Sequence, residues 1–225
     1  MSNKNIFVAC DVSSQKEIID LLELIHNDIS GIKIGLQYIT RSSPQEIKEL
    51  SKFKKPIFYD GKFFDIKNTL VESIRSLKDL NVNYATVHLL NGLDALKAAN
   101  QAAQEININL LGVSVLTSFS DDDLNKLGFN NKVENQIERL IKIAIEAKLY
   151  GVICSPLEVK MIKRISPKLK CFTPGIRMED TNDDQKRTMN ANEAIKEGSD
   201  CLIIGRPITK GDPKENIKYI LSSID

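Results

Sequence analysis

The stretch PIFYDGKFFDIKNTL, residues 56–70, places a short apolar run directly before a cluster of charged residues. The apolar run at 56–59 has the length of a buried β-strand, and residues 65–80 have the spacing of apolar residues typical of a helix. Asp60 and Lys62 lie at the junction, two positions apart, so on an extended strand their side chains point to the same face. The stretch therefore predicts a strand followed by a helix, with charged groups where the strand ends.

The same pattern of strand and then helix occurs eight times along the chain. Each apolar run is bounded by Gly, Pro, Asn, Asp or Ser, and a segment with helical spacing follows it. Strict alternation is typical of parallel strands joined by crossover helices, and eight such units in 225 residues predict a single-domain (β/α)8 TIM barrel over 1–225. The expected strands are residues 5–10, 31–35, 56–59, 82–89, 108–116, 151–155, 169–173 and 200–205.

An open, doubly wound sheet is the main alternative architecture. Such a sheet usually has five or six strands and often carries a G-x-G-x-x-G turn, which this sequence lacks. The barrel is therefore favoured. Two polar stretches, 117–132 and 174–188, are expected to form long loops between its elements.

Composition and charge limit the partners and location of this protein. The 31 Lys and Arg residues balance 30 Asp and Glu residues, so we expect neither a nucleic-acid partner nor a membrane partner, which usually require a basic excess. No stretch approaches the ~18 apolar residues that a membrane span needs. The cysteines show no C-x-x-C spacing and lie in or beside apolar segments, which indicates buried thiols of a cytoplasmic protein: Cys10, Cys154, Cys171 and Cys201.

Charged residues fall at the carboxyl ends of several expected strands, where barrels of this kind place their chemistry. Asp11 ends the first strand, and Lys33 lies within the second. If both face the barrel interior with Asp60 and Lys62, charges of alternating sign surround one small space. Breaking a buried pair of this kind costs on the order of 3–5 kcal/mol, so proteins seldom keep such an array for stability alone.

The loops after the seventh and eighth strands indicate a site for phosphate, which barrels often bind there. TPGIR at 173–177 and IIGRP at 203–207 each supply a glycine for close backbone approach and an arginine for bidentate contact. The alternative is that Arg177 and Arg206 are surface residues in ordinary turns.

These motifs together resemble those of the orotidine 5′-phosphate decarboxylase family, over essentially the whole chain. The signature D-x-K-F-x-D-I-x-x-T of that family is present as DGKFFDIKNT, residues 60–69, although Gly61, Phe64 and Lys67 depart from the residues common there. Flanking blocks also match in order: ACD, GIKIG, VHLLNG, VSVLTS, VICSPLE, TPGIR and LIIGRPIT. No single block is specific, but their number and order are.

The resemblance implies decarboxylation of orotidine 5′-monophosphate to uridine 5′-monophosphate (UMP) and CO2, without any metal or cofactor, as the last step of pyrimidine nucleotide synthesis. Lys62 would protonate the ring carbon after CO2 leaves, with Asp60 beside the substrate carboxylate and Lys33 in the same charged network. Asp65, which we expect to open a helix, would join that network from the partner subunit of a homodimer. The expected substrate-binding residues are Asp11, Lys33, Asp60, Ile66, Thr69, Thr117, Ser118, Arg177, Gln185, Gly205 and Arg206.

Two other functions stay open on the sequence. Barrels that act on sugar phosphates, such as 3-hexulose-6-phosphate synthase, share D-x-K-x-x-D but use Mg²⁺ to stabilise an enediolate; Ile66, Thr69 and the position of Lys33 favour the pyrimidine enzyme. A barrel that only binds nucleotide phosphate would bind UMP without turnover. His88, at the end of the fourth strand, is expected to be structural, and the loop that holds Arg177 is expected to act as a lid.

Overall fold

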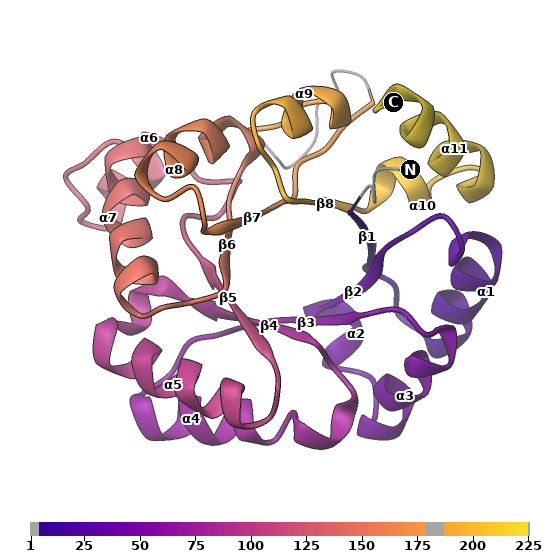
Figure 1. Ribbon diagram of the computed structural model, residues 1–225, viewed down its shortest axis with the longest axis horizontal. Coiled ribbons are helices and arrows are strands. Elements are labelled where there is room, and N and C mark those ends of the chain that lie inside the picture. The colour runs from indigo at the N-terminus through magenta and orange to yellow at the C-terminus, as the bar shows by residue number, and fades with distance from the viewer. Residues whose placement is uncertain (1–4, 179–186, 225) are drawn as a thin grey trace.

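The structure, a computed structural model, describes residues 5–178 and 187–224. Within these residues, eight parallel strands pair in sequence order and β8 pairs with β1, which closes a barrel (Figure 1). The predicted (β/α)8 barrel is therefore confirmed. The strands are β1 (Ile6–Cys10), β2 (Gly31–Gly35), β3 (Ile57–Phe63), β4 (Tyr84–His88), β5 (Asn109–Val113), β6 (Gly151–Ile153), β7 (Lys170–Thr173) and β8 (Cys201–Ile204).

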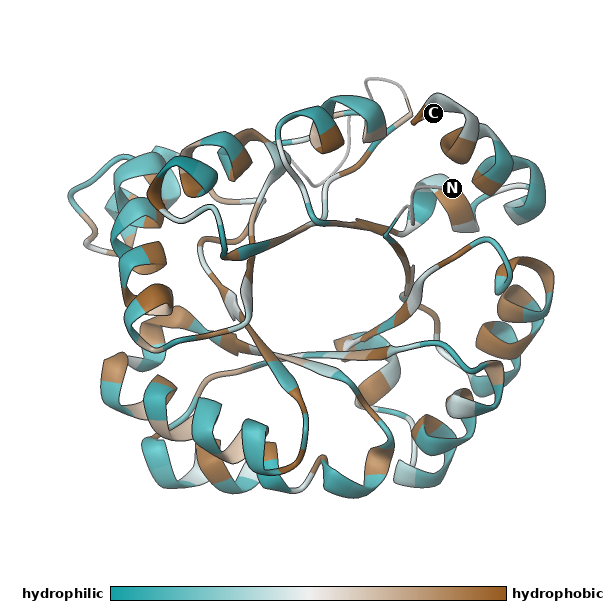
Figure 2. Ribbon diagram, viewed as in Figure 1, coloured by the Kyte–Doolittle hydropathy of each residue, from teal (hydrophilic) through white to brown (hydrophobic). Residues whose placement is uncertain are grey.

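Helices cover the outside of the barrel, with hydrophilic residues on their outer sides (Figures 1 and 2). Among the described helices, none is long and apolar enough to cross a membrane. The α-helices are α1 (Gln15–Ile25), α2 (Leu36–Ile39), α3 (Pro44–Glu49), α4 (Lys67–Arg75), α5 (Leu93–Glu105), α6 (Asp121–Lys126), α7 (Val133–Glu146), α8 (Val159–Ile165), α9 (Ala191–Lys196), α10 (Arg206–Thr209) and α11 (Pro213–Ser223). Short 3₁₀ helices are η1 (Leu50–Phe53), η2 (Lys78–Leu80), η3 (Leu89–Asn91) and η4 (Pro156–Glu158).

Helix α1 shows how the sequence determines these elements. Its buried residues recur at the helical period: Ile18, Leu21, Leu22 and Ile25. The hydroxyl of Ser14 accepts a hydrogen bond from the first turn, which satisfies a backbone N–H that the helix itself leaves without a partner. One apolar face and a capped start are therefore enough to fix this helix against the strands.

Aromatic side chains fill the amino-terminal part of the barrel interior. Phe7 of β1 packs edge-on against Phe58, Tyr84 and Phe172, with ring centroids 6.5, 5.6 and 6.0 Å away. Gly31 on β2 makes room for this layer, because a Cβ there would lie 2.2 Å from Cε1 of Phe7. Since the layer closes the interior from below, space for a ligand lies toward the carboxyl ends of the strands.

Strand β3 differs from the prediction, because it continues past Tyr59 to Phe63. Its pairing with β4 is irregular between these two residues, and Lys62 has a φ of 47°, in the left-handed region. The backbone N–H of Lys62 donates to the hydroxyl of Thr86. The expected strand was too short because it was defined by its apolar run, whereas its last part carries charged side chains.

The segment 117–132, expected as a loop, contains the short helix α6, so this expectation is wrong in part. Ser120 and Asp123 form a capping box, in which each side chain accepts the backbone N–H of the other residue. The S-x-x-D pattern was the available signal for this helix start.

The cysteines are buried with free thiols, as predicted: Cys10, Cys154, Cys171 and Cys201. Burial raises the pKa of Cys10 to about 12, so this thiol stays protonated near neutral pH. Burial also raises the pKa of Cys201. Thiols in this state are packing groups and poor nucleophiles.

Candidate active site

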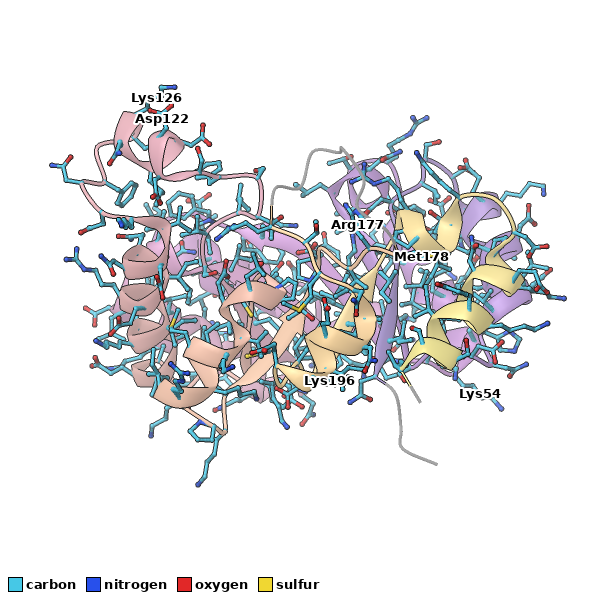
Figure 3. All side chains as sticks on the ribbon, turned by 90° about the horizontal axis from the view of Figure 1, so that it is seen from above. Lys54, Asp122, Lys126, Arg177, Met178 and Lys196 are labelled. Carbon is cyan, nitrogen blue, oxygen red and sulfur yellow. The ribbon has the colours of Figure 1, made fainter. Side chains whose placement is uncertain are left out.

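A cavity of about 290 Å³ lies at the carboxyl ends of the strands. Figure 3 shows the barrel from the side, with Arg177 toward this end and Lys54 and Lys196 toward the opposite end. The cavity collects side chains that are far apart in the sequence. The predicted site residues that line it are Asp11, Lys33, Asp60, Lys62, Thr117, Arg177, Gly205 and Arg206.

The first ion pair in the cavity joins β2 to the segment after β1. Nζ of Lys33 lies 2.6 Å from Oδ1 of Asp11; the lysine side chain is 7% exposed and the aspartate 52%. The pair therefore presents a carboxylate to the cavity over a buried ammonium. Gly35 is needed for this arrangement, because a Cβ there would lie 2.5 Å from Oδ1 of Asp11 and 3.1 Å from Nζ of Lys33.

The second ion pair lies entirely on β3. Nζ of Lys62 is 2.7 Å from Oδ2 of Asp60, and Oδ1 of Asp60 accepts a hydrogen bond of 3.0 Å from Thr86 on β4. The same Thr86 hydroxyl accepts the backbone N–H of Lys62 at 2.8 Å. A lysine in the left-handed region costs on the order of 1 kcal/mol, which other contacts must offset, and Thr86 supplies such a contact.

Sequence reasoning did not single out Thr86. A signal was present, because Tyr84, Thr86 and His88 alternate along the fourth expected strand and so share one face. Apart from Lys33, the candidates were taken from the ends of the expected strands and the segments after them, so Thr86, inside the fourth strand, was passed over. Thr86 is fully buried, so its hydroxyl has protein partners in place of water: it donates to the carboxylate of Asp60 and accepts the backbone N–H of Lys62.

His88 ends β4 beside the second ion pair. Burial lowers the pKa of His88 below its ordinary value, and the positive charge of Lys62 lowers it further. Its Nδ1 accepts the backbone N–H of Leu90 at 3.4 Å, and its ring centroid lies 5.5 Å from that of Phe64. These contacts are typical of a structural histidine, and a neutral ring adds no positive charge next to Lys62.

Turns that carry arginine form the wall of the cavity after β7 and β8. Gly175 and Arg177 follow β7, while Gly205 and Arg206 follow β8. Arginine guanidinium groups can bind an anion such as phosphate, and a glycine beside each of them has no side chain to prevent the anion from approaching the backbone. Gln185, which we also expected here, lies outside the described residues.

The two residues expected to meet the pyrimidine are placed differently. Thr117 lines the cavity just beyond β5, next to Val115 and Leu116. Ser118 is exposed, and the described residues that line the cavity do not include it. The structure thus brings Thr117 to the site but leaves Ser118 outside it.

The residues expected to act across a dimer lie on the outer surface of their own chain. Residues 64–69 are exposed, and the described lining of the cavity does not include Asp65, Ile66 or Thr69. Ile66 is 74% exposed, which is unusual for a large apolar side chain. The expectation that Asp65 opens the helix is wrong, because α4 begins at Lys67 and Asp65 accepts the N–H of Ile66 before it.

Ammonium groups fixed by carboxylates in a cavity can stabilise a developing anion and can supply a proton. Among residues 5–178 and 187–224, no group of three or more His, Cys, Asp or Glu side chains is arranged to hold a metal ion. The lysine–carboxylate pairs that line the cavity offer electrostatic stabilisation and proton transfer.

Fold and site together define a class, the (β/α)8-barrel enzymes whose cavity combines lysine–carboxylate pairs with arginine-bearing turns after the last two strands. Residues 4–220 match the model of the Orotidine 5'-phosphate decarboxylase / HUMPS family. The chain belongs to this family, and the resemblance found in its motifs is confirmed.

Similar proteins of known name match along their full length. The chain is 37% identical over 221 residues to the orotidine 5′-phosphate decarboxylase of Wolbachia pipientis subsp. Culex pipiens (strain wPip), with 97% of this chain and 98% of that protein covered. It is 36% identical to that of Dichelobacter nodosus (strain VCS1703A), with both chains covered completely. The crystal structure of orotidine 5′-phosphate decarboxylase from Lactobacillus acidophilus matches with a TM-score of 0.86 at 30% identity, covering 99% of each chain.

Proposed function

We propose that this chain decarboxylates orotidine 5′-monophosphate to UMP and CO2, without metal or cofactor, with Lys62 as the proton donor. The observation that carries the proposal is the Lys62–Asp60 pair, 2.7 Å apart, in a cavity that also contains Arg177 and Arg206. Relatives that match along the full chain are named for this reaction.

The reaction needs electrostatic help because it leaves a carbanion without an ordinary electron sink. When the bond to the carboxylate breaks, its electron pair stays on the ring carbon, and CO2 departs. A fixed ammonium where negative charge develops favours the transition state over the ground state. Lys62 supplies that ammonium and then transfers a proton to the carbon, which completes UMP.

Asp60 has a complementary role in this proposal. Thr86 and Lys62 hold its carboxylate in place, so it cannot turn away from a second carboxylate in the cavity. Repulsion between Asp60 and the substrate carboxylate is relieved as CO2 leaves, and UMP has no such group. The repulsion thus raises the free energy of the bound substrate but not that of the bound product.

The rest of the cavity binds the nucleotide. In this proposal Asp11 and Lys33 hold the ribose hydroxyls and Thr117 meets the pyrimidine, with Ser118 close behind it in the chain. Phosphate is bound by Arg177, Gln185, Gly205 and Arg206. Binding energy from the phosphate, far from the reacting carbon, can be used to desolvate and orient the chemical end.

We also propose that the enzyme works as a homodimer with shared sites. The exposed segment 64–69 would enter the partner's cavity, where Asp65 joins the charges, with Ile66 and Thr69 beside it. Exposure of Phe64 (62%) and Ile66 (74%) supports a partner surface at this place. One domain over 1–225, a cytoplasmic location and the lack of a nucleic-acid or membrane partner stay predictions.

The absorbance of orotidine 5′-monophosphate tests the proposed reaction, because loss of the carboxylate changes the spectrum of the ring. We expect the purified protein to convert it to UMP at the same rate with and without a chelator. Loss of turnover in chelator would instead indicate a metal-dependent reaction, and a lack of turnover of this substrate without any UMP binding would favour the Mg²⁺-dependent sugar-phosphate enzymes. Binding of UMP without any turnover would indicate a barrel that only binds nucleotides.

Gly35→Ala tests whether the Asp11–Lys33 pair must keep its geometry. The added methyl group would displace Oδ1 of Asp11, so we expect kcat/KM to fall about 10- to 100-fold, the usual effect of a shift near 1 Å in a binding group. Gly128→Ala is the control for a glycine replacement outside the cavity: nothing lies within 4 Å of its added carbon, but its φ of 85° strains an alanine, so the folding of both variants is compared first by circular dichroism. Equal activity of the two variants would show that the pair does not need its present position.

A further inference from the structure

Arg187 is a mostly buried arginine that joins segments after three different strands. Its Nη1 donates to Oε1 of Glu158, at the end of η4 after β6. Its Nη2 donates to the backbone carbonyl oxygens of Val115, at 3.3 Å, and Leu116, at 2.9 Å, after β5. Arg187 itself follows β7, on the way to α9. One guanidinium thus connects the segments beyond β5, β6 and β7.

Glu158 also has a hydrogen-bond partner other than the guanidinium of Arg187. Its Oε2 accepts the backbone N–H of Ser155 at 2.9 Å, and the hydroxyl of Ser155 donates to the carbonyl oxygen of Arg187 at 3.2 Å. Burial raises the pKa of Glu158 to about 7, and the charge of Arg187 opposes that rise. A buried ion pair contributes little net stability, because desolvation of both charges offsets their attraction. The Glu158–Arg187 pair therefore matters more for the fixed position it gives the guanidinium than for the stability it adds.

The carbonyl groups that Arg187 binds belong to the wall of the cavity. Val115, Leu116 and Thr117 are consecutive lining residues, and Thr117 is the proposed contact to the pyrimidine. They lie beyond Val113, the last residue of β5 that pairs with the neighbouring strands. Hydrogen bonds from Arg187 therefore fix a backbone that the barrel sheet leaves unpaired.

On its other side, Arg187 is connected to the turn proposed to bind phosphate. Two residues further on, the N–H of Met189 donates to the carbonyl oxygen of Gly175 at 3.1 Å, and the N–H of Arg177 donates to that of Met189 at 3.0 Å. The segment that carries Arg187 is thus paired with the segment that carries Arg177. A short chain of contacts leads from Thr117 to Arg177.

We propose that Arg187, supported by Glu158, is a positioning residue that holds Thr117 in register with Arg177, so that the pyrimidine and phosphate ends of one nucleotide bind together. Arg187 does not line the cavity and acts through the backbone at 115–116. The inference rests on the proposed function, since it requires a nucleotide as the ligand.

Arg187→Lys is the variant that separates position from charge. Lysine keeps a positive charge near Glu158, but one ammonium cannot replace a planar fork that reaches a carboxylate and two carbonyl groups. We expect kcat/KM to fall about 10- to 100-fold, the effect of losing a hydrogen bond from a charged group. The matched control is Arg164→Lys, in the last turn of α8, where the side chain is exposed and no change is expected.

A double-mutant cycle with Thr117→Ala distinguishes positioning from a general structural role. If Arg187 acts through Thr117, Thr117→Ala should cost several-fold less in the Arg187→Lys background than in the wild type, because that contact is already impaired. If the loss of kcat/KM in the double variant equals the product of the two single losses to within about twofold, the two residues act independently and the proposal is overturned. So would an Arg187→Lys enzyme that is as active as Arg164→Lys.

Glu158→Gln provides a second route to the same conclusion. The amide oxygen of glutamine can still accept the N–H of Ser155, while Arg187 loses its counter-charge. The same cycle with Thr117→Ala decides the question if Arg187→Lys does not fold by circular dichroism. Lack of turnover by the wild type would contradict the proposed function. An active wild type, together with independent effects of the substitutions in the cycle, would contradict this inference alone.

Discussion

Replacing Lys62 by alanine is expected to lower kcat/KM for orotidine 5′-monophosphate by about 10⁴-fold or more. The variant loses both the ammonium at the developing carbanion and the proton donor, which contribute about 10²- to 10³-fold and 10²- to 10⁴-fold in other enzymes. It also leaves Asp60 without its 2.7 Å partner, so the substrate carboxylate meets an uncompensated charge. Stopped-flow or steady-state absorbance of the substrate measures the loss.

UMP binding gives the complementary measurement for the same variant. UMP lacks the carboxylate, so Lys62→Ala should weaken its binding far less than it lowers turnover. Lys196→Ala is the control, because Lys196 is exposed at the opposite end of the barrel (Figure 3). A loss of activity below tenfold in Lys62→Ala would remove Lys62 from the role of proton donor.

Asp65→Ala is expected to lower kcat/KM by about 10²- to 4 × 10³-fold, although Asp65 lies on the outside of its own chain. Truncating one partner of a buried charged pair costs about 3–5 kcal/mol, and each 1.4 kcal/mol is about tenfold in rate. Within its own chain, Asp65 accepts only the adjacent N–H of Ile66 among the described contacts, so stability should change little.

Asp122→Ala is a matched control for this aspartate. Asp122 is exposed on α6 and pairs with Lys126 at 2.6 Å, so its removal costs one surface ion pair (Figure 3). The measurement is kcat/KM of both variants at several protein concentrations. If Asp65→Ala matched Asp122→Ala in activity, the shared site would be excluded.

The barrel could be predicted because its strands are buried on both faces and therefore appear as short continuous apolar runs. A continuous apolar run did not mark the whole strand where charged residues of the site take the place of apolar ones. β3 continues through Asp60 and Lys62, which the Thr86 hydroxyl holds in an irregular ladder. The end of β3 was therefore obscured by the residues that form the site.

The charged centre could be predicted because Asp60 and Lys62 are close in sequence, while Asp11 directly follows β1 and Lys33 lies on the neighbouring strand β2. Contacts between distant segments could not. Glu158 and Arg187 are 29 residues apart, and Arg187 reaches Leu116 across 71 residues, so neither contact follows from strand order or periodicity. Their positions depend on how three loops pack above the barrel.

The position of Asp65 shows the limit of periodicity at a helix boundary. Apolar spacing extends back from α4 to include Asp65, but Ile66 is extended, with ψ of 153°, and the helix begins after it. Boundaries depend on one or two dihedral angles that propensity does not determine. As a result, Asp65 lies on an exposed turn, from which its carboxylate can be presented to another chain.

Mixing two inactive variants tests the central claim most directly, namely that two chains build each ionic site. Lys62→Ala and Asp65→Ala, unfolded together and refolded as a mixture, form hybrid dimers in which one of the two sites has both residues intact. Since half of the dimers are hybrids at random pairing, about one quarter of wild-type activity should return. A mixture that stays as inactive as its two components, while forming dimers, would contradict the shared site.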